Sequence, residues 1–414
     1  MHNSHARRTS TYIYASIATA ITVGIIAFPE DSFRAALDGL AVWWEIVFPA
    51  LLPFFVASEI LMGLGVVHML GVLLEPLMRP MFNVPGVGAY ALAMGLASGY
   101  PMGAKITAQL RSKRLCSRIE AERLVSITNT ADPLFMVGAV AVGMLGNAKL
   151  GVVVVLAHYS ASILLGFVMR FYGRRGTETS GARPSRKTGL LSHAVNELVS
   201  ARESDGRSIG HLLGDAVHES VKTLLLVGGF IMVFSVVTRI LALAGVTHLI
   251  ATPLGVALRR FGVEPSILDA LVKGFFEITI GCQEASMASA SIATQLIAIS
   301  AIIGWSGLSV CAQVASLVHE AGIRLHAYLS ARVIHAVLSA VACALLLRLQ
   351  PFSVPAAELQ ASATRLVYQP SAIGTLIGST KLLAGALAVT SVCALLVSLP
   401  ASLRVVRFFY SSKK

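Results

Sequence analysis

Charged side chains are scarce in this sequence. Of its 414 residues, 13% are charged and 55% are hydrophobic, a balance that excludes an ordinary soluble protein and is typical of a chain that crosses a bilayer many times. The five cysteines are scattered, and none has the spacing of a metal site. The sequence also lacks HExxH, P-loop and GxSxG motifs. We therefore expect a polytopic membrane protein that is not an enzyme and holds no metal or other cofactor.

The charges that are present are mostly basic, with 33 Lys and Arg residues against 21 Asp and Glu residues. Aromatic residues are not interleaved with them, and no hydrophilic segment is long enough for a nucleic-acid-binding domain, so we expect no nucleic-acid partner. Cytoplasmic loops of membrane proteins are enriched in Lys and Arg. The excess therefore serves to assign membrane orientation, and the partners we expect are the lipid bilayer and a small substrate.

Eight apolar segments predict full transmembrane spans, at 12–28, 47–67, 124–146, 150–171, 219–245, 293–319, 325–348 and 377–400. Residues 68–83 and 246–261 mix charges with apolar residues, as helices in the membrane interface do. Residues 172–215 form the long hydrophilic segment, rich in Gly, Ser, Pro and basic residues, and predict a partly disordered linker. The domains expected are an N-terminal helix at 1–33, repeats at 34–171 and 216–348, the cytoplasmic linker 172–215, and a last helix with a basic tail at 349–414.

Residues 95–105 interrupt an apolar run where a membrane helix should continue. They contain three glycines at four-residue spacing, Pro101 and Lys105. Proline removes a backbone donor, and a lysine inside a membrane is costly. The flanking arms, 86–98 and 102–113, are each too short to span a bilayer. The stretch predicts a re-entrant hairpin, and the alternative is one kinked spanning helix with close-packed glycines.

A similar series of features recurs in the second half of the chain. Gly65-Val66-Val67-His68 corresponds to Gly245-Val246-Thr247-His248, and two short arms follow at 265–278 and 283–292. Interrupted apolar segments in corresponding positions of two halves are typical of secondary transporters. If each hairpin enters and leaves on one face, most Lys and Arg residues fall on the cytoplasmic side. The sequence then predicts an all-α fold of inverted repeats, each with a re-entrant hairpin and an interrupted helix, and about eight spans with both termini cytoplasmic.

Four motifs occur together in this order: Ser98-Gly99-Tyr100-Pro101-Met102-Gly103-Ala104-Lys105, Asn129-Thr130-Ala131-Asp132-Pro133-Leu134-Phe135, His158-Tyr159-Ser160 and Gly304-Trp305-Ser306-Gly307-Leu308-Ser309. They resemble the sporulation integral membrane proteins of endospore-forming bacteria that carry the nucleoside-recognition (Gate) domain. The resemblance covers approximately residues 35–345. It implies a stage V role in moving dipicolinate out of the mother cell, across the outer forespore membrane. It also implies a fold related to concentrative nucleoside transporters, with two hairpins and two unwound helices around the substrate.

The candidate substrate-binding residues lie at the four interruptions. They are Ser98, Gly99, Tyr100, Gly103, Lys105, Asn129, Thr130, Asp132, Glu277, Thr279, Gln283, Glu284, Ser306 and Ser309. Lys105 would neutralise a carboxylate of an anionic substrate, unless it extends its ammonium to the cytoplasmic face or pairs with Asp132. The carboxylates of the second hairpin tip would carry a proton or bind sodium, and the coupling ion is left open between H⁺ and Na⁺. We expect His158, Arg332 and His335 to be packed in spans that frame the site.

The function expected is secondary transport of dipicolinate, or a similar small aromatic carboxylate, by alternating access. One alternative is a nucleoside or nucleobase transporter of the same superfamily. Another is a structural membrane protein of sporulation that docks partners through 172–215, although a scaffold has no use for costly intramembrane polar residues. The sequence leaves a homo-oligomer open.

Overall fold

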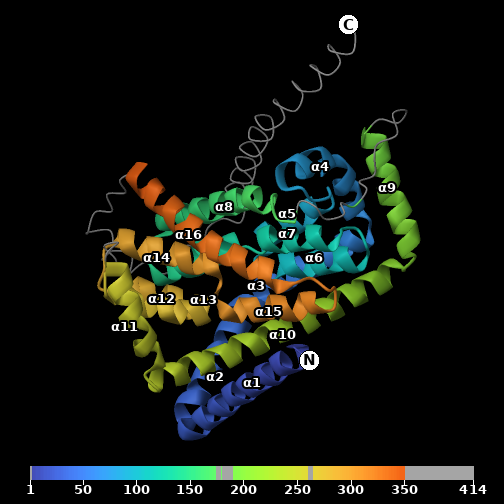
Figure 1. Ribbon diagram of the computed structural model, residues 1–414. Helices are drawn as coiled ribbons and strands as arrows, with labels where there is room; N and C mark the ends of the chain where they lie inside the picture. Colours follow the sequence, from blue (N-terminus) through green and yellow to red (C-terminus); the bar gives the residue numbers. More distant parts are fainter. Residues whose placement is uncertain (1, 174–178, 180–189, 260–263, 350–414) are drawn as a thin grey trace.

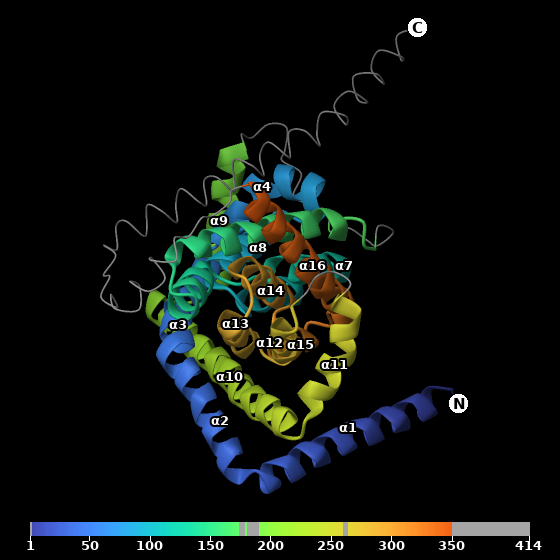
Figure 2. The ribbon, with the colours of Figure 1, turned by 90° about the vertical axis from the view of Figure 1, so that its left-hand side faces the viewer.

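The computed structural model describes residues 2–173, 179, 190–259 and 264–349. The described part of the chain is helical throughout, without strands, and the all-α membrane fold expected from composition is confirmed (Figure 1). The chain begins with α1 (His2–Ala27), α2 (Pro29–Val42), the π-helical segment η1 (Trp43–Val47), α3 (Phe48–Gly63) and α4 (Val66–Phe82). Helix α1 projects away from the rest of the molecule in Figure 2, and α2 turns back toward it.

The middle of the chain contains the first two predicted interruptions. Helices α5 (Gly88–Ser98) and α6 (Met102–Ser112) form an antiparallel pair about Gly99, Tyr100 and Pro101. Helix α7 (Arg118–Thr128) then stops five residues before the π-helix η2 (Leu134–Met144) begins, and α8 (Ala148–Met169) follows. Proline disfavours helix at the residue before it, so Pro133 ends α7 early and opens the stretch between the two helices.

The second half repeats this order. Helices α10 (Ile209–Leu243) and α11 (Val246–Arg259) lead to a second antiparallel pair, α12 (Ser266–Phe276) and α13 (Ile278–Met287). Helix α14 (Ile292–Trp305) is separated from α15 (Gly307–His319) by Ser306, and α16 (Leu325–Leu349) ends the described chain. Both predicted hairpins are therefore helix pairs. The second arm of the second pair is α13, and not 283–292 as predicted, so Gln283 and Glu284 lie within a helix and not at the tip. That they re-enter the membrane, and from opposite faces, stays a prediction.

Four helical segments are long and apolar enough to cross a membrane: Ala148–Met169, Ile209–Leu243, Ile292–His319 and Leu325–Leu349. They confirm the segments predicted at 150–171, 219–245, 293–319 and 325–348. Two further spans arise if α1 with α2, and α3 with α4, each count as one span bent by 104° and 83°. The segment at 124–146, predicted as a span interrupted at Asn129–Pro133, is divided between α7 and η2 at that interruption. The segment at 377–400 lies outside the described residues. The described chain thus gives four to six spans.

Helix α16 packs against α14 and α8 with one face, while Val333, Val337 and Val341 are exposed on another (Figure 1). Gly304 makes close packing possible, because a Cβ atom at that position would lie 2.8 Å from Ala336 Cα. Small residues that let helix backbones approach are the usual basis of helix association in membranes. Helices α14 and α16 of the second half are therefore closely packed, and α16 also contacts α8 of the first half.

Residues 190–205 correct the prediction of a partly disordered linker. They form helix α9 (Leu190–Asp205), which packs along α4. Ala194, Leu198 and Ala201 recur at helical spacing, and Gly65 on the α3–α4 turn lies against the Leu198 carbonyl and the Ala201 side chain. Serine and charged residues on the other faces concealed this apolar stripe in a segment chosen by its overall hydrophilic composition.

Candidate functional site

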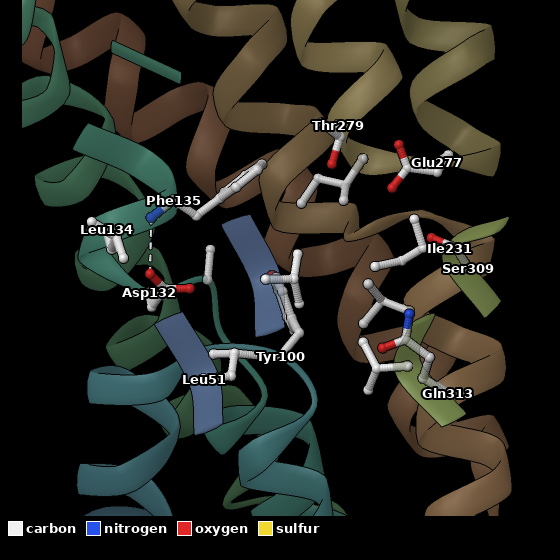
Figure 3. A pocket seen from close by; sticks show the side chains of 15 residues that line it. Leu51, Tyr100, Asp132, Leu134, Phe135, Ile231, Glu277, Thr279, Ser309 and Gln313 are labelled. Atoms are coloured by element: carbon white, nitrogen blue, oxygen red, sulfur yellow. Dashed lines mark hydrogen bonds between the residues drawn. The ribbon is translucent and has the colours of Figure 1, made fainter. Parts of the chain in front are cut away.

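All four helix interruptions meet at one cavity. Its volume is about 100 Å³, and it lies where the α5–α6 tip, the α7–η2 break, the α12–α13 tip and the start of α15 approach one another (Figure 3). The lining residues are Val47, Leu51, Tyr100, Ala131, Asp132, Leu134, Phe135, Val227, Ile231, Glu277, Ile278, Thr279, Ser309, Val310 and Gln313. Most are apolar, with a few polar groups from separate elements, as is usual for a small-molecule site.

The first hairpin tip brings Tyr100 to the cavity. The Tyr100 hydroxyl donates a hydrogen bond to the Ile303 carbonyl at 2.8 Å, so this tip is joined to the end of α14. Gly99 has a φ of +74°, and a Cβ there would lie 2.5 Å from Asp132 Oδ2. Only glycine adopts this conformation readily while leaving space for the carboxylate. Gly99 therefore permits the contact between the hairpin tip and the α7–η2 break.

Asp132 belongs to the α7–η2 break and lines the cavity. Its Oδ1 atom accepts a hydrogen bond of 2.8 Å from the backbone N–H of Phe135, in the first turn of η2 (Figure 3). The preceding residues of the break face the protein: Thr130 donates to the Gly95 carbonyl at 3.2 Å, and Asn129 Nδ2 donates to the Tyr328 hydroxyl at 2.8 Å. A carboxylate at a helix N-terminus is stabilised by free N–H groups and the helix dipole.

Glu277 has the same role at the second hairpin tip. It is buried, and its Oε2 atom accepts a hydrogen bond of 2.8 Å from the Ile280 N–H in the first turn of α13. Figure 3 shows Glu277 and Thr279 across the cavity from Asp132. Each half of the chain thus contributes one carboxylate, and each carboxylate caps a helix that begins at the cavity.

The start of α15 differs because no side chain caps it. Ser306 and Gly307 both have positive φ angles, which turn the chain sharply between α14 and α15. Ser309 follows within the first turn, is 1% exposed, and has no hydrogen-bond partner for its hydroxyl among the described residues. The N-terminus of α15 therefore offers free backbone N–H groups beside an unpaired hydroxyl that lines the cavity.

Lys105 does not line the cavity. Its ammonium forms an ion pair of 2.8 Å with Glu59 on α3 and lies 5.3 Å from the centre of the Phe55 ring. Gln109, one helical turn away, donates to the same Glu59 oxygen at 2.8 Å. Pairing with Asp132, the alternative considered from the sequence, is therefore wrong. No feature of the sequence around Lys105 indicated its partner, because Glu59 belongs to a separate helix.

Other predicted site residues also lie elsewhere. Glu284 forms an ion pair of 2.6 Å with Lys273 on α12, and Gln283 is exposed. Gly103 packs against the Thr128 carbonyl, where a Cβ would lie only 2.2 Å away, and Ser98 is buried beside the tip. The structure brings Tyr100, Asp132, Glu277, Thr279 and Ser309 together at the cavity, whereas Ser98, Gly103, Gln283 and Glu284 do not line it.

The three buried basic residues expected to frame the site do so. His158 Nε2 accepts a hydrogen bond of 3.1 Å from the Ala131 N–H, and His335 Nε2 donates to the His158 carbonyl at 3.0 Å. Arg332 donates to backbone carbonyls at the end of α7. His158 and Arg332 thus fix the backbone of the α7–η2 break, which forms part of the cavity wall.

Gln313 is a lining residue that the sequence analysis did not select. It is a lone amide in the apolar helix α15, one turn after Ser309, so the four-residue spacing between two polar residues was the available signal. The apolar lining residues Val47, Leu51, Val227 and Ile231 carried no such signal, because they resemble every other apolar residue of a span.

An aromatic contact joins the second helix pair to α14. The rings of Phe275 on α12 and Trp305 on α14 stack with centroids 5.2 Å apart and planes 5° from parallel. The Trp305 indole N–H donates to the Phe275 carbonyl at 2.9 Å. The last turn of α12 is therefore joined to the end of α14, next to the Glu277 tip.

Known proteins resemble this chain in sequence and, more distantly, in structure. The model of the Gate family, described as nucleoside recognition, matches residues 44–174. Two solved structures of the concentrative nucleoside transporter CNTnw are each 13% identical to this chain. The match to the outward-facing structure covers 83% of this chain and 86% of that chain, with a TM-score of 0.37. The match to the intermediate-state structure covers 84% of this chain and 87% of that chain, with a TM-score of 0.39.

A curated relative covers most of the chain. The sporulation integral membrane protein YlbJ of Bacillus subtilis (strain 168) is 45% identical over 334 residues, which is 81% of this chain and 82% of that protein. Identity of this extent, together with the Gate match over the first hairpin and the α7–η2 break, shows the family. The chain belongs to the family of sporulation integral membrane proteins that includes YlbJ.

Proposed function

We propose that this protein is a secondary transporter whose substrate binds in the central cavity. The observation that carries the proposal is the convergence of four helix interruptions on that cavity. Irregular backbone at membrane depth is tolerated where it is buried in protein or lines a cavity. Paired discontinuous segments around one site are the arrangement from which alternating access is built in other transporters.

The substrate proposed is dipicolinate or a similar small aromatic dicarboxylate, moved out of the mother cell across the outer forespore membrane. Lys105 does not support this proposal, because Glu59 neutralises it. The uncapped N-terminus of α15 supports it better: backbone N–H groups, the Ser309 hydroxyl and the Gln313 amide can together donate to one carboxylate. The apolar lining suits the ring.

Asp132 and Glu277 suit the coupling of transport to an ion. Each carboxylate faces the cavity while one of its oxygens caps a helix. A proton or a cation bound there would offset their charge when an anionic substrate enters. Protonation or ion binding at these two residues would then accompany each transport cycle, with the two hairpins opening alternately to the cytoplasm and to the opposite face.

Nucleoside or nucleobase transport is the second candidate. Asp132, Glu277 and Gln313 could accept and donate hydrogen bonds to a neutral base or a ribose, and the matched family model is described as nucleoside recognition. A neutral substrate would need no compensation for its charge. For a neutral substrate, Asp132 and Glu277 would act as hydrogen-bonding groups and not as sites of charge compensation. Variants at these two residues that reduce transport equally at every pH would therefore favour a nucleoside or nucleobase over a dicarboxylate.

Uptake of labelled dipicolinate, uridine and adenine into proteoliposomes tests the proposal. We expect saturable dipicolinate uptake. Ser309→Ala should reduce it at sub-saturating substrate by about 10- to 150-fold, because a hydrogen bond to a charged group contributes about 1.5–3 kcal/mol. Ser289→Ala, at an exposed position in the α13–α14 turn, is the matched control and should leave uptake unchanged.

The result decides between the candidates. Uptake of uridine or adenine alone would replace dipicolinate with the second candidate. Absence of uptake for all three compounds, with correctly folded protein, would favour the structural role in sporulation.

A further inference from the structure

Arg332 is an unusual group in the centre of the molecule. It is the largest side chain among the fully buried ones of the described chain, with 0% exposure. Among the residues that the structure describes, no carboxylate forms an ion pair with it, whereas Lys105 has one such partner and Lys273 has two. A buried charge is strongly unfavourable unless other groups compensate it. The compensation for Arg332 must therefore come from groups other than side-chain anions.

Backbone carbonyls at the end of α7 provide that compensation. Arg332 Nη1 donates to the Asn129 carbonyl at 2.9 Å, and Nη2 donates to the Ser126 carbonyl. The last carbonyls of a helix lack partners within the helix and carry the negative end of its dipole. The guanidinium also lies 5.3 Å from the ring of Tyr328, one turn earlier on α16. The broken helix and the cation thus stabilise each other.

Other side chains complete this end of α7. Ser162 donates to the Ile127 carbonyl at 3.1 Å, and the Tyr159 hydroxyl is shared between the Leu96 carbonyl at 2.9 Å and the Ala131 carbonyl at 3.2 Å. The Thr128 carbonyl lies against Gly95, where a Cβ would be only 1.9 Å away. The carbonyls that the break frees from the helix are therefore largely engaged by protein donors from α8 and α16.

In transporters with unwound helices, carbonyls of this kind and the C-terminal ends of half-helices are where coupling cations bind. We propose that Arg332 is a tethered cation that takes the place of a coupling ion at the end of α7. A positive charge stays permanently at the break, held on α16 from the other half of the chain. This inference rests on the proposed function, and it assigns proton coupling to Asp132 and Glu277, so that transport does not depend on sodium.

Thermal unfolding of the purified full-length protein in detergent tests this role without any substrate. The wild type should have the same apparent Tm in sodium chloride and choline chloride of equal ionic strength. Arg332→Ala should lower the Tm by several degrees, and methylguanidinium or sodium should restore part of the loss where choline does not. Arg332→Lys keeps the positive charge on a single ammonium group. The Tm of this variant should therefore lie between those of the wild type and Arg332→Ala, and sodium should not change it.

Arg348→Ala is the matched control, because Arg348 is an exposed arginine on the same helix. Its Tm should not change with any of these cations beyond the change seen for the wild type. If Arg332→Ala does not yield folded protein, the Tm values of Arg332→Lys and Arg332→Gln are compared instead. Sodium should then raise the Tm of Arg332→Gln and leave that of Arg332→Lys unchanged.

Two results would overturn the proposal: specific stabilisation of the wild type by sodium, or a decrease in the Tm of the Arg332 variants that no small cation restores.

Sodium dependence of transport is measured separately. Replacing sodium by choline on both sides of proteoliposomes should change the initial rate of dipicolinate uptake less than twofold, and a larger dependence on sodium also contradicts the proposal. If no tested compound is transported, the proposed function fails while the Tm measurements still decide the role of Arg332.

Discussion

The two helix pairs, α5–α6 and α12–α13, neutralise their lysines in different ways. Lys105 on α6 pairs with Glu59 on α3, outside its own pair, at 2.8 Å. Lys273 on α12 pairs with Glu284 on α13 at 2.6 Å and lies 3.6 Å from Asp269, within its own pair. The first pair is thus joined to a neighbouring helix by a charge, whereas the second is closed on itself.

Glycines show the same difference. Gly95 and Gly103 of the first pair both lie against the Thr128 carbonyl of α7, while Gly281 of the second pair lies against Gly274 of the same pair, where a Cβ would be 2.2 Å from the Gly274 Cα. Both of these glycines of α5–α6 pack against α7, whereas Gly281 packs within α12–α13. In its lysine pair and in these glycine contacts, the first helix pair therefore depends more on neighbouring helices than the second, which is joined to α14 by Phe275 and Trp305.

The largest contrast we expect is in membrane sidedness. Ser112 is the last residue of α6 and Ser289 follows α13, and both positions are exposed. In a cysteine-free background, Ser112→Cys should be modified by an impermeant thiol reagent from the cytoplasmic side and Ser289→Cys from the opposite side. Modification of both from one side would contradict the inverted arrangement of the two pairs.

Alanine substitutions at Gly95 and Gly274, which occupy corresponding positions in the two helix pairs, should have very different effects on folding. Gly95→Ala places a Cβ 1.9 Å from a backbone oxygen, which cannot move aside, whereas Gly274→Ala meets the flexible side chain of Ile302 at 2.8 Å. We expect Gly95→Ala to prevent accumulation of folded protein and Gly274→Ala to cost about 1–3 kcal/mol, as overpacking usually does. Size-exclusion profiles and thermal unfolding measure both, with Gly214→Ala, which meets no atom within 4 Å, as the control.

Removing the charge partner of Lys105 should have a large effect. Glu59→Gln leaves a buried ammonium without its carboxylate, and breaking a buried pair in this way costs about 3–5 kcal/mol. Lys105→Met combined with Glu59→Gln should recover most of the loss in the thermal unfolding of detergent-solubilised protein. A double variant as unstable as Glu59→Gln alone would show that the charge pair is not the cause.

The equivalent change in the second pair should have the smallest effect. Glu284→Gln leaves Lys273 with Asp269, and the Glu284 side chain is 34% exposed. Partly exposed ion pairs contribute about 0.2–1 kcal/mol. The same unfolding assay should therefore show a change of at most about 1 kcal/mol, and a loss as large as that of Glu59→Gln would remove the distinction between the pairs.

The sequence contained the positions of the four interruptions but not the partners of the residues at them. Pro101, Pro133 and the Ser306-Gly307 dipeptide are local breaks whose physical effect needs no tertiary information. Glu59 as the partner of Lys105 depends on how α3 packs beside α6. The acceptors of Arg332 are backbone carbonyls, which every residue has, so no pattern of side chains could identify them.

The same reasoning explains why helix α9 was not predicted. Residues 190–205 were assigned by composition, and their stripe of Ala194, Leu198 and Ala201 is too weak to outweigh the surrounding polar residues until α4 is placed beside it. The segment at 124–146 is the opposite case, because Pro133 divides it as its local effect on the backbone predicts.

The stack of Trp305 on Phe275 makes the protein suitable for fluorescence measurements. Only three tryptophans are present, and Trp43 and Trp44 lie together at the start of η1, with ring centroids 5.7 Å apart. Replacing those two by phenylalanine would leave Trp305 as the single emitter, in contact with the last turn of α12. Displacement of that turn would change its quantum yield and emission maximum, so movements of the second helix pair could be followed in real time without an attached dye.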